Sequence, residues 1–220
     1  MIQSSIVTHK APMEAQSEIV PHVFVVDDDI SVRESLGPLI SSAGWRTETF
    51  ASGREFLARP SVAAPSCLVL DVSLPDMDGL EVQSQFASVR TSTPIIFITG
   101  SPDIPTTVRA IKAGAIEFLI KPVREDVLLD AVANAVELSR VELRREIETS
   151  ALRSRYASLT PREAEVMALA VAGRLNKLIA DELGISEITV KAHRGKMMRK
   201  MMARSVPDLV RMAATLGIPK

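Results

Sequence analysis

Short runs rich in β-branched residues alternate with stretches of helical pattern from residue 22 to about residue 125, and this alternation constrains the fold more than any other feature. Helices between successive strands predict parallel strands, in a sheet that is covered on both faces. The predicted strands are 22–26, 46–50, 67–70, 94–98 and 116–120. The predicted helices are 31–43, 53–58, 79–89, 105–113 and a long one beginning near 124. An α/β domain with a five-stranded parallel sheet is therefore expected.

The last third of the chain is helical throughout and predicts a separate all-α domain. Thr160 with Pro161 and Glu163 forms a capping-box sequence, and glycines at 173 and 184 are suited to ending the next two helices. Ser186 is expected to cap a third, basic helix that runs to about residue 202, and Ser205 a fourth. Two short helices, a glycine turn and a basic helix indicate a helix-turn-helix that binds DNA.

Between these parts, residues 125 to about 156 form one long, highly charged helical stretch with a partly regular apolar stripe. It is interpreted either as a solvated linker helix or as one that packs against a partner helix in a short coiled coil. The predicted division of the chain is a flexible tail at 1–20, a sheet domain at 21–140, a helical linker at 141–158 and a helix-turn-helix domain at 159–220.

Charge separates the two halves more clearly than the net charge of −1 suggests. Residues 1–150 contain 13 basic and 21 acidic residues, whereas residues 151–220 contain 13 basic and 6 acidic residues. A basic C-terminal part favours a nucleic-acid partner. No apolar run approaches the length of a membrane helix and no signal-peptide pattern begins the chain, so a cytoplasmic protein without membrane contact is expected. The single cysteine, Cys67, is interpreted as a core residue.

Polar side chains stand at the ends of four predicted strands. Asp27 and Asp28 follow the first strand, Asp71 the third, Thr99 the fourth and Lys121 the fifth. The carboxyl ends of parallel strands meet at one edge of a sheet, where ligands bind, so these side chains are expected to converge. Clustered carboxylates repel one another unless a cation neutralises them, and oxygen ligands favour Mg²⁺. A metal, a lysine, a hydroxyl and a nucleophilic carboxylate together suit a phosphoryl group.

Five short motifs stand out, and four of them contain these residues. They read Val26-Asp27-Asp28-Asp29, Leu70-Asp71-Val72-Ser73-Leu74-Pro75-Asp76-Met77-Asp78-Gly79, Ile98-Thr99-Gly100, Lys112-Ala113-Gly114-Ala115 and Lys121-Pro122. With them the chain resembles the response regulator receiver family, and as a whole it resembles FixJ/StyR-type regulators with a LuxR/NarL-type output domain. The resemblance covers about residues 21 to 218.

The resemblance implies a flavodoxin-like, doubly wound sheet and a regulator of transcription rather than an enzyme. It implies that Asp71 accepts a phosphoryl group from a sensor histidine kinase, and that Asp27, Asp28 and Asp71 hold Mg²⁺ with the Ser73 carbonyl. Lys121 would pair with the phosphoryl group, Thr99 would move towards it, and Phe118 would change rotamer. The phosphorylated chain would form a homodimer and bind double-stranded promoter DNA, with RNA polymerase as a further candidate partner.

Residues 186–194 resemble the recognition helix of LuxR/NarL-type domains. Lys191 is the best candidate for a base-edge or phosphate contact, and Ile188 and Val190 are expected to anchor the helix to its core. Gly195 inside this helix costs roughly 1 kcal/mol relative to alanine, and it would let the backbone approach DNA closely. The further predicted phosphate contacts are Thr189, Arg194, Lys196, Arg199 and Lys200.

Two alternatives remain open from the sequence. In a haloacid-dehalogenase-like phosphatase, Asp27 would be the nucleophile and Asp71 a bystander, although the sheet domain is small and the C-terminal helices would then lack a purpose. In a constitutive DNA-binding protein, a receiver-like domain would only dimerise and would not be phosphorylated.

Overall fold

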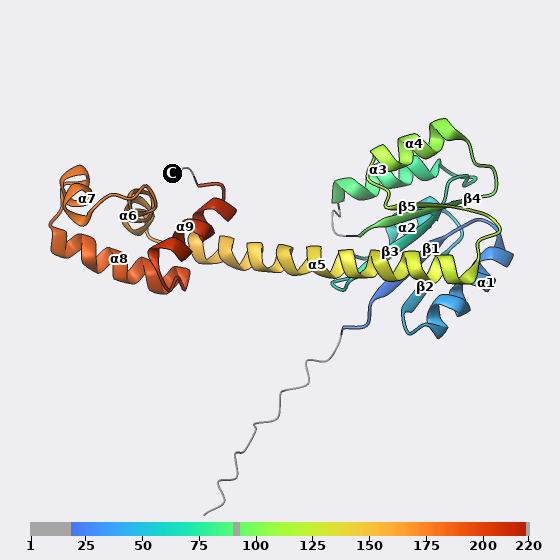
Figure 1. Cartoon of the computed structure of the whole chain (residues 1–220), viewed down its shortest axis with the longest axis horizontal. Helices are drawn as coiled ribbons and strands as arrows, with labels where there is room; N and C mark the ends of the chain where they lie inside the picture. The colour runs from blue at the N-terminus through green and yellow to red at the C-terminus, as the bar shows by residue number, and fades with distance from the viewer. Residues whose placement is uncertain (1–18, 90–92, 219–220) are drawn as a thin grey trace, which may run out of the picture. The chain divides into compact units, whose positions relative to one another are not determined.

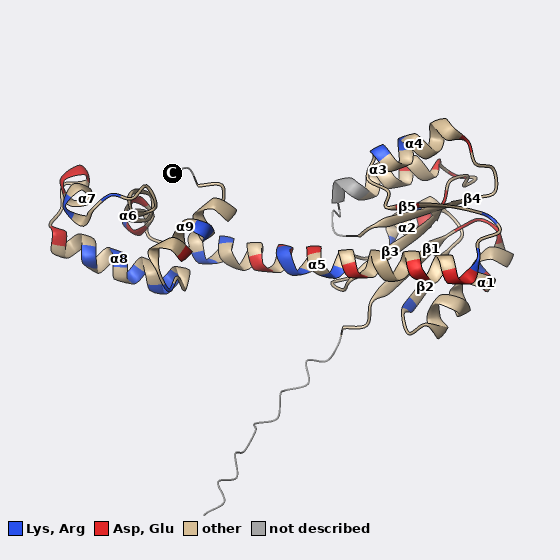
Figure 2. Ribbon diagram, viewed as in Figure 1, with Lys and Arg blue, Asp and Glu red and all other residues tan. Residues whose placement is uncertain are grey.

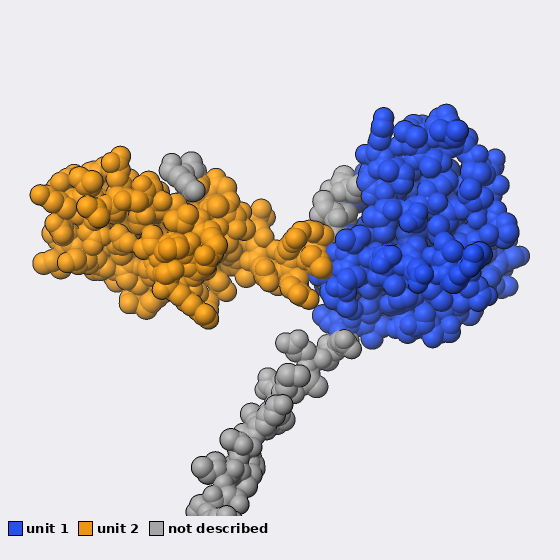
Figure 3. All heavy atoms as spheres, viewed as in Figure 1, with its two compact units in different colours: residues 1–140 blue, residues 141–220 orange. Residues whose placement is uncertain are grey.

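The computed structural model describes residues 19–89 and 93–218. The chain divides into two compact units, residues 1–140 and 141–220 (Figure 3). The predicted tail at 1–20 lies almost wholly outside the described residues. None of the described helices is both long and apolar enough to span a membrane.

The first unit contains a five-stranded sheet whose strands all run parallel, in the order β2-β1-β3-β4-β5 (Figure 1). Every predicted strand is confirmed with ends within one residue of the prediction, because each apolar run is short and is bounded by turn or polar residues. The strands are β1 (His22–Val26), β2 (Arg46–Phe50), β3 (Ser66–Asp71), β4 (Ile95–Thr99) and β5 (Glu117–Ile120).

Helices cover both faces of this sheet, and alternate strand residues point to opposite faces. Val23 and Val25 pack beneath α1 and α5, whereas Phe24 and Val26 pack against α2, α3 and α4. Burying each such side chain contributes roughly 1.5–3 kcal/mol to folding, so both faces are strongly specified. The helices are α1 (Ile30–Ser42), α2 (Gly53–Ala58), α3 (Gly79–Val89), α4 (Ile104–Lys112) and α5 (Glu125–Ala157).

The second unit is helical, as predicted, and three of its described helices begin at the expected caps. Thr160 and Glu163 form the full capping box, and the side chains of Ser186 and Ser205 each accept a backbone hydrogen bond. Gly184 ends α7 in the left-handed conformation, whereas α8 ends on Met202, a non-glycine residue with φ 56°. The helices are α6 (Pro161–Val171), α7 (Asn176–Leu183), α8 (Glu187–Met201) and α9 (Val206–Thr215).

Candidate functional site

The sheet brings the predicted phosphoryl-site residues together at the carboxyl ends of its strands. Val26 pairs with Leu70 in the register of β1 and β3, so Asp27 and Asp71 follow neighbouring positions. Thr99 pairs with Ile120 between β4 and β5, which places Lys121 directly after that pair. Parallel pairing of the central strands therefore gathers residues that are up to 94 positions apart in the sequence.

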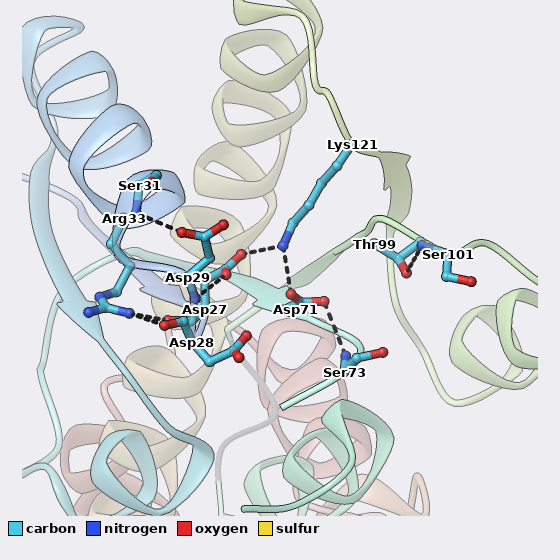
Figure 4. A network of polar contacts seen from close by, with 10 residues as sticks. All are labelled: Asp27, Asp28, Asp29, Ser31, Arg33, Asp71, Ser73, Thr99, Ser101 and Lys121. Carbon is cyan, nitrogen blue, oxygen red and sulfur yellow. Dashed lines mark hydrogen bonds and ion pairs between the residues drawn. The ribbon is translucent and has the colours of Figure 1, made fainter. Parts of the chain in front are cut away.

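Lys121 lies between two of the carboxylates (Figure 4). Its Nζ is 2.6 Å from Asp27 Oδ2 and 2.6 Å from Asp71 Oδ2. Burial by itself would lower the pKa of Lys121, but the hydrogen bonds to Asp27 and Asp71 outweigh that effect and raise the pKa above its ordinary value. The lysine is therefore a fixed positive charge in this pocket.

Three carboxylates meet at the same place. Oxygen atoms of Asp27, Asp28 and Asp71 all lie within 4.8 Å of one another; Asp27 and Asp71 are buried, and Asp28 is exposed. Burial raises the pKa of Asp27, and the hydrogen bonds from Lys121 and from the Asp29 backbone amide offset this only in part. One lysine does not balance three carboxylates, and the donors are all oxygen atoms, so the residues present fit a hard divalent cation.

Two residues for which no role was predicted, Asp29 and Arg33, hold the acidic loop in place. Arg33 Nη1 of α1 donates hydrogen bonds to the carbonyl oxygens of Asp27 and Asp28, at 2.7 and 2.9 Å. The Asp29 side chain accepts from the backbone amide of Ser31 and caps α1. The sequence could have indicated the role of Asp29, because aspartate is a preferred cap directly before a helix. No sequence pattern near Arg33 predicts its contacts with the loop.

The loop after β3 is held equally firmly. The Ser73 amide donates to Asp71 Oδ1 at 3.1 Å, and Asp76 accepts from the backbone amides of Gly53 and Arg54 at the start of α2. At Gly79, an added Cβ would lie 2.4 Å from the Asp71 carbonyl oxygen. Glycine is therefore required at 79, because any larger residue would push the backbone that carries Asp71.

Thr99 and Phe118 do not take part in the hydrogen bonds between Lys121 and the carboxylates. Thr99 is buried, and its hydroxyl accepts from the Ser101 amide at 3.2 Å (Figure 4). Phe118 is half-buried, with its ring centroid 6.2 Å from that of Phe97. Among the described residues, the Thr99 hydroxyl therefore bonds to the Ser101 amide and makes no hydrogen bond to Asp71.

In the second unit, lysine and arginine gather along α8 (Figure 2). Lys191, Lys196 and Arg199 are exposed there. Two more predicted DNA contacts are held inside the unit, since Arg194 Nη1 donates to Asn176 Oδ1 at 2.9 Å, and Lys200 Nζ donates to Glu163 Oε2 at 2.6 Å. The Thr189 hydroxyl lies 2.8 Å from that of Ser186. The three exposed cations are thus the more accessible members of the predicted set.

One expectation for this helix is wrong. Val190 is completely buried, as expected of an anchor, but Ile188 is 80% exposed and contributes nothing to the core. On a helix, residues two positions apart point about 200° apart, so burial of Val190 turns Ile188 outwards.

Comparisons with known proteins identify the family of each part of the chain. The model of the response regulator receiver domain matches residues 23–133, and that of the luxR family of bacterial regulatory proteins matches residues 157–213. A receiver domain followed by a luxR-type domain defines a class of transcriptional regulators. The chain belongs to this class: it is a two-component response regulator with a luxR-type DNA-binding domain.

Its relatives cover nearly the whole chain. Nodulation protein W of Bradyrhizobium diazoefficiens is 50% identical, over 89% of this chain and 86% of that protein. Response regulator protein TmoT of Ectopseudomonas mendocina is 45% identical, over 88% of each chain. The solved structure of response regulator StyR matches with a TM-score of 0.80 and 46% identity, over 89% of this chain and 98% of that chain.

These findings confirm the predicted fold class and family. They favour the regulator over the phosphatase alternative, because both the sheet domain and the C-terminal helices match parts of regulatory proteins. The individual roles of the site residues and the exact domain limits stay predictions.

Proposed function

We propose that Asp71 is the phosphoacceptor, that its donor is a phosphohistidine of a sensor kinase, and that the modification controls dimerisation and promoter binding. The observation that carries the proposal is the position of Lys121, whose ammonium group lies 2.6 Å from carboxylate oxygens of both Asp27 and Asp71. An ammonium group at this place is suited to neutralise a phosphoryl group on Asp71.

In the transfer step, a carboxylate oxygen of Asp71 attacks phosphorus. The new O–P bond forms as the N–P bond to the kinase histidine breaks, and the imidazole nitrogen keeps the electron pair. Lys121 stabilises the developing negative charge, and the Ser73 amide, which donates to Asp71 Oδ1, orients the nucleophile.

Asp27, Asp28 and Asp71 would hold Mg²⁺ together with the Ser73 carbonyl oxygen. The metal would supply neutralisation of the phosphoryl oxygens. Arg33 keeps two of the carboxylates in position through the backbone of the acidic loop, and the Asp29 cap holds the same loop against α1.

The proposed switch begins at Thr99. A phosphoryl group adds roughly −1.5 to −2 charge at Asp71, and a hydrogen bond from Thr99 to it requires the hydroxyl to leave the Ser101 amide. Movement of Thr99 would open space that the ring of Phe118 fills. Thr99 lies in β4 and Phe118 in β5, and side chains of both strands pack in one core cluster with Ala110 of α4.

The face of α4 and β5 is the proposed dimer interface. Ile104, Val108 and Ile111 recur at spacings of four and three along α4, and all three are exposed, as is Ile120 of β5. An exposed apolar stripe of this kind typically marks a protein interface. A dimer would present two copies of α8 to two half-sites on DNA.

DNA binding is proposed to run through the basic residues of α8. Lys191 would contact a base edge or a phosphate, and the exposed Lys196 and Arg199 would contact phosphates. Thr189, Arg194 and Lys200 would reach phosphates only on leaving their partners within the unit. The sheet domain at 21–140 would act on the domain at 159–220 through the helical linker at 141–158. Because promoter DNA and RNA polymerase are its proposed partners, the protein would act in the cytoplasm as a regulator and not as an enzyme.

Intact-mass spectrometry tests the proposal. The wild type and Asp71→Asn are incubated with acetyl phosphate and Mg²⁺, while oligomeric state and promoter binding are followed in parallel. One phosphoryl group is expected on the wild type and none on the variant. Dimerisation and tighter DNA binding are expected to accompany the modification of the wild type alone.

Either of two results would count against the proposal. Equal uptake by Asp71→Asn would show that another residue is the acceptor. Full uptake by the wild type with no change in oligomeric state or DNA binding would favour the constitutive DNA-binding alternative.

A further inference from the structure

The packing of its own domain does not explain why the side chain of Ile188 is exposed. It is the second residue of α8, and its side chain is 80% exposed. The opposite side of the same helix is buried, with Val190, Met197 and Met201 completely inaccessible. A β-branched apolar side chain on the outward side of a basic helix therefore contributes little to folding.

Two small residues, Ala192 and Gly195, follow Ile188 on the outward side of α8. Ala192, Gly195 and Arg199 follow it at spacings of four, three and four residues, which places all four on one side of the helix. A Cβ added at Gly195 would find only Arg199 Nη1 near it, at 3.8 Å, among the described residues. The unit's own packing thus gives no reason for a glycine, although it costs roughly 1 kcal/mol in a helix.

The surroundings of this face match one partner. Lys191 lies about one helical turn from Ile188, and Lys196 and Arg199 are exposed on the same helix. Their positive charge makes this face suited to a polyanionic partner. In a helix-turn-helix, residues at the start of the recognition helix reach the base edges of the major groove. Val190 is buried there and the Thr189 hydroxyl already contacts Ser186. The exposed long side chains near the helix start are Glu187, Ile188 and Lys191, and Ile188 is the apolar one among them.

Only one group in the major groove is apolar, the 5-methyl group of thymine. We propose that Ile188 determines sequence specificity by packing against this methyl group in each half-site, while the small residues Ala192 and Gly195 let the helix approach closely. The inference rests on the DNA-binding function and adds a base preference to it: a thymine next to the position that Lys191 contacts.

Deoxyuridine substitution tests this proposal, since deoxyuridine pairs as thymidine does and lacks only the methyl group. A binding site is first selected from random double-stranded DNA with the full-length wild type, with and without acetyl phosphate. Each thymidine of the selected site is then replaced in turn. One replacement in each half-site is expected to weaken wild-type binding by about 4-fold, the equivalent of one buried methylene-sized group.

Ile188→Ala is expected to lose that discrimination at the same position, with affinities for thymidine and deoxyuridine DNA within about 2-fold of each other. Ile188→Val keeps the branched methyl groups and should retain it. Met202→Ala, which alters another exposed apolar side chain of the α8 end, is the matched control and should behave as the wild type. Thermal unfolding of each variant establishes that it is folded.

The proposal is overturned if Ile188→Ala discriminates as the wild type does at every thymidine, or if no thymidine in a selected site is sensitive. It is equally overturned if the substitution changes only the oligomeric state, since Ile188 would then contact a second copy of the chain. A wild type that selects no sequence at all would instead contradict the DNA-binding function itself.

Discussion

The positive charge of Lys121 is stabilised by the two carboxylates that lie beside it. The ammonium group lies 2.6 Å from carboxylates at the carboxyl ends of β1 and β3, and burial would disfavour its charge if those carboxylates were absent. Gly79 likewise depends on its surroundings, because the backbone at Asp71 leaves no room for a Cβ. Both residues therefore depend on elements that are distant in the sequence.

Met202 offers a test of local strain. It ends α8 in the left-handed conformation, with φ 56°, and its side chain is 65% exposed. Met202→Gly is expected to stabilise the second unit by about 1 kcal/mol, because glycine adopts this conformation without a Cβ clash. Urea unfolding followed by circular dichroism measures the change.

Ala192→Gly is the control for that prediction. Ala192 is an exposed residue inside the same helix, so glycine there should destabilise the unit by about 1 kcal/mol. If Met202→Gly were also destabilising, the side chain of Met202 would have to contribute packing that outweighs the strain.

At the scale of elements, an ion pair joins α6 to α8. Glu163 lies at the start of α6 with its side chain only 3% exposed, and Lys200 of α8 lies 2.6 Å from it. Lys200 also donates to the Ser158 carbonyl oxygen, and Glu163 accepts from the Thr160 amide. The pair thus connects the start of α6 to α8. Because its ammonium group is already paired, Lys200 is less available to DNA than the exposed cations of α8.

This pair predicts an acid-sensitive contribution to stability. The hydrogen bond from Lys200, with help from the Thr160 amide, lowers the pKa of Glu163 from its ordinary 4.5 to about 2. Because the folded-state pKa is the lower one, the carboxylate stabilises the unit fully above the unfolded-state pKa and loses this effect as the pH falls towards 2. The stability difference between wild type and Glu163→Gln is therefore expected to be largest above about pH 5 and to shrink at lower pH.

Urea unfolding at a series of pH values measures that difference. Glu165→Gln is the matched control, since Glu165 pairs with Arg162 on the exposed side of α6 and such pairs contribute less than about 1 kcal/mol. A difference between wild type and Glu163→Gln that stays constant from pH 7 to pH 3 would show that the charge of Glu163 contributes nothing.

At the scale of the whole molecule, the proposed switch depends on a dimer. The exposed apolar stripe of α4 with Ile120 of β5 is the proposed interface, and the exposed Ile147 of α5 belongs to the alternative, a linker coiled coil. The two interfaces differ in what they predict, because only the first shares elements with Phe118, which is proposed to respond to the phosphoryl group.

Ile111→Glu distinguishes these interfaces. A charge placed in the α4 stripe should raise the dimer dissociation constant of the phosphorylated protein by at least about 10-fold, since it would be desolvated without a partner. Phosphoryl uptake should be unchanged. Ile147→Glu, the control on the linker helix, should dimerise as the wild type does.

Sedimentation of the acetyl-phosphate-treated proteins gives the dissociation constants, and intact mass gives the uptake. If Ile147→Glu abolishes dimerisation and Ile111→Glu does not, the linker is the interface and the α4 stripe needs another explanation.

Much of this protein could be predicted from sequence, because the determining interactions are local. Apolar periodicity predicted every strand to within one residue. Thr160, Ser186 and Ser205 predicted three helix starts, because each caps its helix through a hydrogen bond to the amide three residues further on. Parallel topology then placed Asp27, Asp71 and Lys121 at one edge of the sheet, since strand ends of equal polarity meet there.

The tertiary structure decided what depends on contacts between distant residues and on which side of a helix faces inwards. The hydrogen bonds of Arg33 to the acidic loop and of Asp76 to α2 join separate elements, and no local pattern encodes either. The pairing of Lys200 with Glu163 is of the same kind. Burial of Val190 set the rotation of α8 and turned Ile188 towards solvent, because one side of a helix cannot pack without exposing the other.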